Sequence, residues 1–162
     1  MVMILSQKEF GMDEKDYEKY EAYRAMKANL SKAMRAEFYY QAIFIEYAII
    51  EDRTLSALKH AGVKVTDKRG MNLKLSAKLN KMRSNPAFTA AYVRKRVPLD
   101  LIDEIEAWKR DRDRLIHALA EIPYDHESIR EIAERGQGLV KIIDSRVKSV
   151  NAYHEKKHTS QE

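Results

Sequence analysis

The chain has 162 residues, a formal net charge of +5 and no cysteine, so disulfide bonds and cysteine-based metal sites are excluded. Its 5 glycines and 3 prolines leave few helix breakers among many good helix formers, which predicts a single all-α domain, a bundle of four or five helices. The apolar run at residues 2–5 is too short for a signal-peptide core, and no stretch is suited to span a bilayer. We therefore expect a cytoplasmic protein with no membrane partner.

Two long helices are predicted in the first part of the chain. Residues 12–29 are strongly charged and have a partial apolar face, which is typical of a helix with one docked side. A second helix is predicted over about residues 31–61, with Ser31 either as its cap or inside a longer helix. From Phe38 to Ile50 it is apolar on nearly all sides. A small domain cannot easily wrap such a helix, so we expect a second subunit to cover it in a homodimer. Glu46 is then an unusual buried carboxylate within this run.

The segment at residues 62–98 is strongly basic. It contains ten basic residues and one acidic residue, a charge of +9 within a chain of net charge +5. An amphipathic helix is predicted over residues 71–83 and a short helix over residues 86–96. The charge asymmetry favours a surface for a nucleic-acid backbone, and the alternative is a solvated lysine-rich face. The side chains expected to bind are Lys74, Lys78, Lys81, Arg94, Lys95 and Arg96.

The most regular helical segment covers residues 99–122. Its apolar stripe, with residues at steps of three and four, is Leu101, Ile105, Trp108, Leu115, Leu119 and Ile122. Arg112 occupies a core position of this stripe, where an arginine is rarely buried unless it is paired, and an ion pair with Glu46 is one explanation. On a helical wheel Arg112 lies within ~20° of Leu101, whereas His117 lies ~160° away. One helix therefore does not present both side chains in the same direction.

The side of this helix that carries His117 also carries charged residues. Arg110, Asp113 and Arg114 lie there, and Asp113 is one turn before His117, where a carboxylate can hold an imidazole. Such a face suits a dimer interface at which two copies of the helix build one cleft. Arginine and histidine without a metal suit phosphodiester transfer in RNA, because the 2′-hydroxyl supplies the nucleophile, histidine transfers protons and arginine binds the phosphate. We expect a 2′,3′-cyclic phosphate and a 5′-hydroxyl as products, and no cleavage of DNA.

The last helix is predicted over residues 127–157. A turn at residues 123–125 precedes it, and Ser128-Ile129-Arg130-Glu131 has the spacing of a capping box. Gly136 and Gly138 lie inside the helix, and close packing against a neighbouring helix explains them better than a phosphate-binding loop does.

His154-Glu155-Lys156-Lys157-His158 has the spacing of the zincin motif. No third ligand follows it, and the lysines between the histidines would repel a cation. We therefore predict a solvated helix end whose basic residues complement the helix dipole, with no metal site and no cofactor.

At its central motif the chain resembles a known family. Arg112-Asp113-Arg114-Leu115-Ile116-His117 is similar to the signature of HEPN domains, in which an arginine and a following polar residue precede a histidine by a short spacing. The resemblance implies an HEPN-like, dimeric all-α core over about residues 37–154, with the helix that contains Glu46 as the second helix. It also implies a metal-independent endoribonuclease of the toxin–antitoxin or phage-defence type, with RNA, a second copy of the chain and a possible cognate antitoxin as partners.

The resemblance assigns roles to individual residues. The catalytic residues are Arg112 and His117 with Asp113 as polar support, and possible further support comes from Arg110, Arg114 and Glu46. Arg110 is also a second candidate for the catalytic arginine, because it too precedes an aspartate.

Two alternatives to a nuclease stay open. The chain is then a non-catalytic HEPN-like module that binds RNA or a nucleotide, or a helical partner-binding protein. Leu119 stands where toxins controlled by nucleotidyltransferase antitoxins have a tyrosine, which argues against that form of control.

Overall fold

The computed structural model of the chain describes residues 13–119, 121, 123 and 125–160. In this part of the chain the regular structure consists of seven helices and one isolated antiparallel bridge, between Thr66 and Asn72. The helices are α1 (Glu14–Arg35), α2 (Tyr39–His60), α3 (Leu75–Ser84), α4 (Pro86–Thr89), α5 (Ala91–Arg96), α6 (Leu99–Ala118) and α7 (His126–Thr159). The prediction of an all-α fold is confirmed, but the predicted number of helices was too low.

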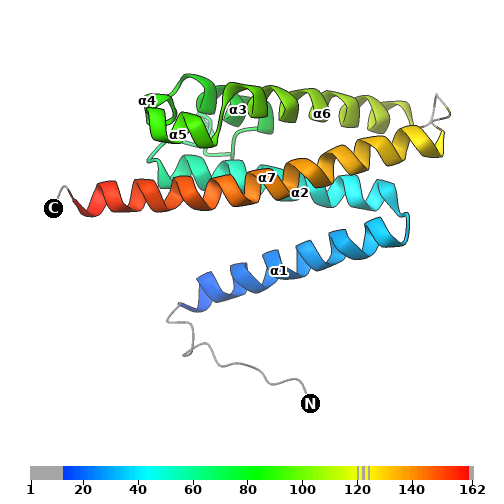
Figure 1. Cartoon of the computed structure of the whole chain (residues 1–162), viewed down its shortest axis with the longest axis horizontal. Coiled ribbons are helices and arrows are strands. Elements are labelled where there is room, and N and C mark those ends of the chain that lie inside the picture. Colours follow the sequence, from blue (N-terminus) through cyan, green and yellow to red (C-terminus); the bar gives the residue numbers. More distant parts are fainter. Residues whose placement is uncertain (1–12, 120, 122, 124, 161–162) are drawn as a thin grey trace, which may run out of the picture.

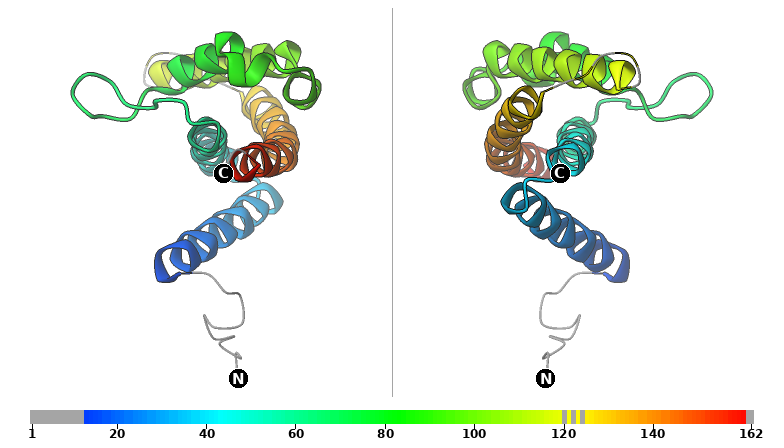
Figure 2. Two further views of the ribbon diagram at one scale, coloured as in Figure 1. Left: turned by 90° about the vertical axis from the view of Figure 1, so that its left-hand side faces the viewer. Right: turned by 90° about the vertical axis from the view of Figure 1, so that its right-hand side faces the viewer.

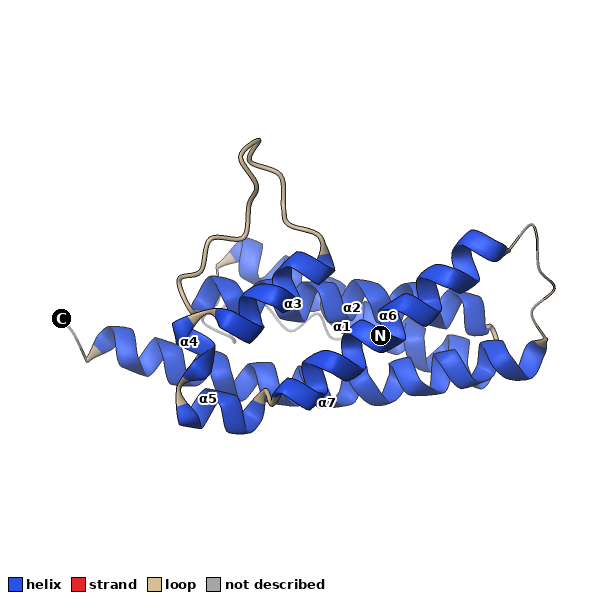
Figure 3. Ribbon diagram, turned by 90° about the horizontal axis from the view of Figure 1, so that it is seen from above, coloured by secondary structure: helices blue, strands red, loops and turns tan. Residues whose placement is uncertain are grey.

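The helices are arranged in three layers. Helices α2 and α7 run side by side through the middle and pack on each other more extensively than any other pair (Figure 1). Helices α3 to α6 lie on one side of this pair and α1 lies on the other, as the end views in Figure 2 show. The connection between α2 and α3, which contains the Thr66–Asn72 bridge, projects away from the layers (Figure 3). No helix within the described ranges is long and apolar enough to cross a membrane.

Helices α1 and α2 end in the same hydrogen-bond pattern. After α2, Gly62 has a φ of 70°, and the next N–H donates to the carbonyl five residues back at 2.9 Å, which is a Schellman motif. After α1, Glu37 takes the same left-handed position with a φ of 59°, and the next N–H again donates five residues back at 2.9 Å. The predicted helix start at residue 31 was therefore wrong. Ser31 lies inside α1, and its hydroxyl donates to the carbonyl of Lys27 at 3.2 Å.

Short polar side chains set the beginnings of other helices. Asp125 accepts a hydrogen bond from the N–H of Ser128 at 2.7 Å and so caps α7. The predicted capping box at residues 128–131 was wrong, because Ser128 already lies inside the helix. Asn85 caps α4 in the same way, with a hydrogen bond of 2.9 Å. The extended backbone of Ala90 then separates α4 from α5, where a single short helix was predicted.

Helices α2, α6 and α7 approach one another at Gly136. A Cβ atom at this position would lie 2.8 Å from Nε1 of Trp108 and would overlap the carboxyl group of Glu46. Trp108 is fully buried, and its Nε1 donates to the carbonyl of Ile132 at 2.9 Å, which holds the indole against α7. The predicted close packing is confirmed for Gly136. Gly138 has open space at its Cβ position, so packing does not explain it.

The two glycines of α7 provide a matched test of this packing. We expect Gly136→Ala to lower the free energy of unfolding by about 1–3 kcal/mol, because the added methyl group overpacks a filled site. Gly138→Ala is the control, and it should raise the stability by up to about 1 kcal/mol through helix propensity. Urea denaturation followed by circular dichroism measures both changes. Equal stabilisation by the two substitutions would contradict the close approach of the three helices.

Candidate functional site

Arg112 lies against an aromatic face of α2. Its guanidinium carbon is 4.3 Å from the ring centroid of Tyr47 and 5.5 Å from that of Phe44. Its Nη1 donates to Oδ1 of Asp113 at 2.9 Å, and its side chain is 17% exposed. Cation–π contacts and one ion pair therefore hold the guanidinium against α2, and a small part of the side chain is exposed.

Asp113 joins two cations of α6. Besides the bond from Arg112, it accepts a hydrogen bond from Nζ of Lys109 at 2.7 Å. Partial burial raises the pKa of Asp113, but the hydrogen bonds from Lys109 and Arg112 outweigh burial and hold this pKa below its usual range. The hydrogen bond to Asp113 raises the pKa of Lys109. Asp113 is thus an ionised residue that positions Arg112, and its carboxylate is not directed at His117.

Glu46 does not pair with Arg112, so the explanation of Arg112 as part of a core ion pair was wrong. Glu46 is fully buried, and neither of its carboxyl oxygens has a hydrogen-bond partner among the described residues. Burial raises the pKa of Glu46 to about 9, so its carboxyl group is protonated at neutral pH. A neutral carboxyl group needs no cation, which leaves Arg112 free to contact the other face of α2.

His117 and its charged neighbours lie on the outside of α6. His117, Arg110 and Arg114 are exposed, and Arg114 makes a long ion pair of 3.8 Å with Asp111. Arg112 instead faces α2, as the helical wheel indicates. Within one chain, therefore, the predicted catalytic arginine contacts the aromatic face while the predicted catalytic histidine faces solvent.

An aromatic surface surrounds the Arg112 guanidinium. Tyr40, Phe44 and Tyr47 lie at steps of four and three along α2, and we call them the aromatic face of α2. Phe44 is 51% exposed and Tyr40 is also exposed. The sequence indicated that α2 is apolar on all sides, and this is the side that the chain itself leaves partly uncovered.

Two of the six predicted nucleic-acid-binding residues have structural contacts instead. Lys78 is buried, and its Nζ binds Oε1 of Glu51 at 3.1 Å. Arg94 donates to the carbonyls of Met82 and Arg83 at 3.2 and 2.9 Å, so it satisfies the end of α3, where carbonyls lack helical partners. We therefore remove Lys78 and Arg94 from the predicted binding surface. Lys74 and Lys95 are exposed, and Lys81 and Arg96 are partly exposed.

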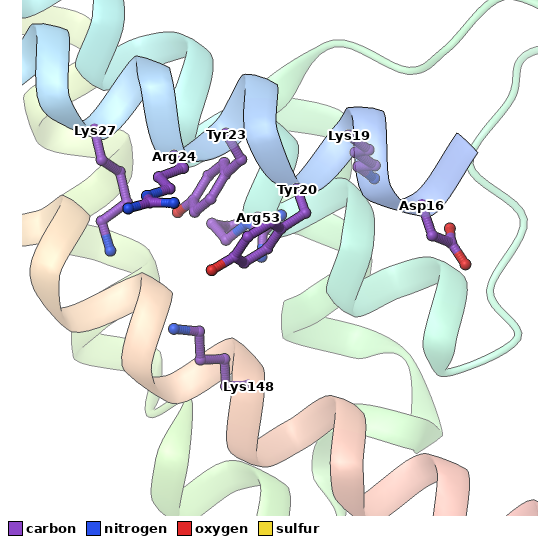
Figure 4. A pocket seen from close by; sticks show the side chains of 8 residues that line it. All are labelled: Asp16, Lys19, Tyr20, Tyr23, Arg24, Lys27, Arg53 and Lys148. Carbon is purple, nitrogen blue, oxygen red and sulfur yellow. The ribbon is translucent and has the colours of Figure 1, made fainter. Parts of the chain in front are cut away.

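A cleft beneath α1 was not predicted. Its volume is about 430 Å³, and it is lined by residues of α1, α2 and α7 (Figure 4): Asp16, Lys19, Tyr20, Tyr23, Arg24, Lys27, Arg53 and Lys148. Buried Asp144 accepts hydrogen bonds from the hydroxyl of Tyr23 at 2.9 Å and from Nζ of Lys27 at 2.8 Å.

Acidic side chains neutralise the cations of this cleft. Lys27 and Lys148 pair with Asp144, at 2.8 and 3.6 Å, Lys19 and Arg53 pair with Asp52, and Arg24 pairs with Glu21 at 3.6 Å. We interpret the cluster as the attachment of α1 to the bundle. No local sequence pattern indicates this cluster, because Tyr23 and Asp144 are 121 residues apart.

The zincin-like stretch near the end of α7 is partly buried. His154 packs against Phe88 with ring centroids 6.1 Å apart, and burial lowers the pKa of His154. Glu155 pairs with Nε2 of His60 at 3.2 Å. The expectation of a fully solvated helix end was therefore wrong for His154. In the described part of the chain, no group of three or more His, Cys, Asp or Glu side chains is arranged to hold a metal ion.

Comparison with known proteins gives no family for this chain. No family model, no curated protein and no solved structure matches it. The resemblance to HEPN domains thus depends on the motif at residues 112–117 and on the all-α fold.

The buried carboxyl group of Glu46 predicts a pH-dependent stability. Its pKa is about 9 in the folded chain against an ordinary value of 4.5, so between these pH values the unfolded state loses a proton that the folded state keeps. Stability therefore falls as the pH rises through this range, by at most about 1.4 kcal/mol per pH unit.

We expect Glu46→Gln to remove this dependence. Its gain in melting temperature over the wild type should grow from about pH 5 to about pH 8, since the amide stays neutral. Exposed Glu104 on α6 provides the control, and Glu104→Gln should show no such growth. If the melting temperatures of the wild type and Glu46→Gln change with pH in parallel, Glu46 is not protonated in the folded chain.

Proposed function

We propose that this protein is a metal-independent endoribonuclease of the HEPN type, which acts as a homodimer on RNA. The observation that carries the proposal is the placement of Arg112. Its guanidinium is held near the surface by Tyr47 and Asp113, and it is not consumed by an ion pair with Glu46 in the core. A positioned, partly exposed arginine and an exposed histidine of the same helix are the two groups that phosphate binding and proton transfer require.

The proposed reaction needs no group beyond these side chains and the RNA. The 2′-hydroxyl attacks the adjacent phosphorus, forming the 2′-O–P bond and breaking the bond to the 5′-oxygen. His117 of one subunit accepts the proton of the 2′-hydroxyl, and His117 of the partner subunit donates a proton to the leaving oxygen. Arg112 stabilises the charge on the phosphoryl oxygens, and Asp113 keeps Arg112 in place. The products are a 2′,3′-cyclic phosphate and a 5′-hydroxyl.

The dimer is required because Arg112 and His117 face different directions on one helix. In the proposal the aromatic face of α2 packs against the second copy, which covers Phe44 and brings two α6 helices together around a two-fold axis. The setting that we propose for such an enzyme is a cytoplasmic toxin or phage-defence effector with a cognate antitoxin.

A second candidate function is that of a non-catalytic RNA-binding module. It is favoured by the basic side chains of α5 that lack acidic partners among the described residues, such as Lys95. This candidate and the nuclease differ in whether RNA is cut.

Cleavage of RNA in the presence of EDTA tests the nuclease directly. The wild type should cut single-stranded RNA and leave the same sequence in DNA intact, because DNA lacks the 2′-hydroxyl. His117→Ala and Arg112→Ala should each lower the rate by at least about 100-fold. Arg35→Ala, which removes an exposed arginine at the end of α1, should cut like the wild type. If both site variants keep full activity, the assignment of the site is wrong, and loss in Arg110→Ala alone would move it to Arg110.

The oligomeric state tests the composite site. The wild type should sediment as a dimer at micromolar concentration, and Phe44→Glu should sediment as a monomer and lose cleavage, because it places a charge in the proposed interface. Leu99→Glu is the matched control, since Leu99 is 48% exposed on α6, far along the helix from the motif. A wild type that sediments as a monomer would contradict the two-subunit cleft.

A further inference from the structure

A groove between α5 and α7 is lined almost entirely by positively charged side chains and by serine hydroxyl groups. Helix α5 lies against α7, as Figures 1 and 3 show. The groove has a volume of about 620 Å³, and its lining residues are Lys95, Arg96, Lys141, Ile142, Ser145, Arg146 and Ser149. Lys95 and Arg96 belong to the basic segment at residues 62–98, whereas Lys141 and Arg146 lie outside it and were not predicted to bind.

The positive charge of this groove is not neutralised. Among the residues that the structure describes, no acidic side chain lines the groove, and Lys95, Lys141 and Arg146 form no ion pair. Every cation of the cleft beneath α1 is, in contrast, paired with a carboxylate. Like-charged side chains that converge without counter-charges repel one another, and an anionic ligand relieves that repulsion. The groove is therefore the more favourable of the two sites for an anion.

The residues of α7 that line the groove continue into an aromatic contact. Lys141, Ser145, Ser149 and Tyr153 follow one another at steps of four, a row about 18 Å long at 1.5 Å per residue. At its end the ring of Tyr153 stacks on that of Tyr92 at 4.7 Å and 18°. The guanidinium of Arg96, which lines the groove, lies 3.5 Å from the centroid of the Tyr92 ring. The groove thus leads to a stack of three planar groups.

This combination matches the chemistry of a single nucleic-acid strand. Lysine and arginine bind successive phosphates, and serine hydroxyls can donate to phosphate oxygens. Aromatic rings and guanidinium planes stack on unpaired bases. A concave groove with a planar stack at one end fits a strand better than it fits the flat surface of a membrane.

We infer that the groove between α5 and α7 binds single-stranded RNA, with the backbone on Lys141 and Arg146 and a base stacked on Arg96. The inference rests on the proposed function only in taking RNA as the ligand. Helix α6 begins at Leu99, shortly after the end of α5. Arg112 lies 13 residues further along α6, a distance of about 20 Å along the helix axis. The groove is therefore a second contact that anchors the RNA away from the candidate catalytic residues.

Binding is measured by fluorescence anisotropy with a labelled single-stranded 2′-O-methyl RNA of about 12 nucleotides, within the usual range of site sizes. Methylation blocks the 2′-oxygen nucleophile, so the probe is not cut. We expect Lys141→Glu/Arg146→Glu to weaken binding at least about tenfold and to reduce the slope of log K against log salt by about 1.4, at ~0.7 per lost contact. Arg96→Lys keeps the charge but loses the planar group, so it should weaken binding about fivefold with an unchanged slope.

The charge-matched control is Lys15→Glu/Lys32→Glu on α1, where both lysines are exposed. It changes the net charge equally and should alter binding less than about threefold. Circular dichroism checks the fold, and Lys141→Gln/Arg146→Gln replaces the first variant if the added carboxylates unfold it. Unchanged binding in the groove variants overturns the inference, as does an equal loss in the control. Groove-dependent binding to phosphatidylserine vesicles without binding of the oligonucleotide also overturns it, in favour of a membrane surface.

The same proteins, assayed for RNA cleavage, separate this inference from the proposed function. Groove-dependent binding without cleavage by the wild type supports the groove and contradicts the nuclease. If cleavage requires His117 but the groove variants bind RNA as tightly as the wild type, the nuclease is supported and RNA binding by the groove is contradicted.

Discussion

The arrangement of the bundle depends on the contact of α2, α6 and α7 around one buried carboxyl group. Glu46 from α2 meets the indole of Trp108 from α6, and both fit only because residue 136 of α7 has no side chain. This contact fixes the distance and rotation of α6 relative to α2. It therefore also decides where the next turn of α6 goes, and with it the place of Arg112 over Tyr47.

The charge of Arg112 is balanced on its own helix. Glu46 is protonated at neutral pH, and the anion that pairs with Arg112 is Asp113, the next residue of α6. Asp113 is 31% exposed and the Arg112 side chain 17% exposed. A phosphate at this position would thus meet an arginine that is already paired with one carboxylate.

Much of the fold followed from periodicity, and the failures have physical reasons. Breakers and apolar spacing placed α3, α6, α7 and the end of α2 to within a few residues, but not the start of α2. The turn after α1 was missed because Glu37 adopts a left-handed conformation that usually signals glycine. In the site, the motif at residues 112–117 could be read directly, but the partners of Arg112 could not. Charge counting likewise assigned Lys78 and Arg94 to the RNA-binding surface. Composition does not show that Lys78 pairs with Glu51, or that Arg94 donates to carbonyls at the end of α3.

The way in which α1 is attached has a consequence for motion. Only Leu30 and Ala33 of α1 are buried, whereas ten residues of α2 are, so detaching α1 exposes little apolar surface. Its remaining attachment is largely polar and converges on Asp144. Local opening of a segment requires less free energy when few apolar contacts are lost. Because α1 buries fewer residues than α2, detaching α1 requires less free energy than separating α2 from α7.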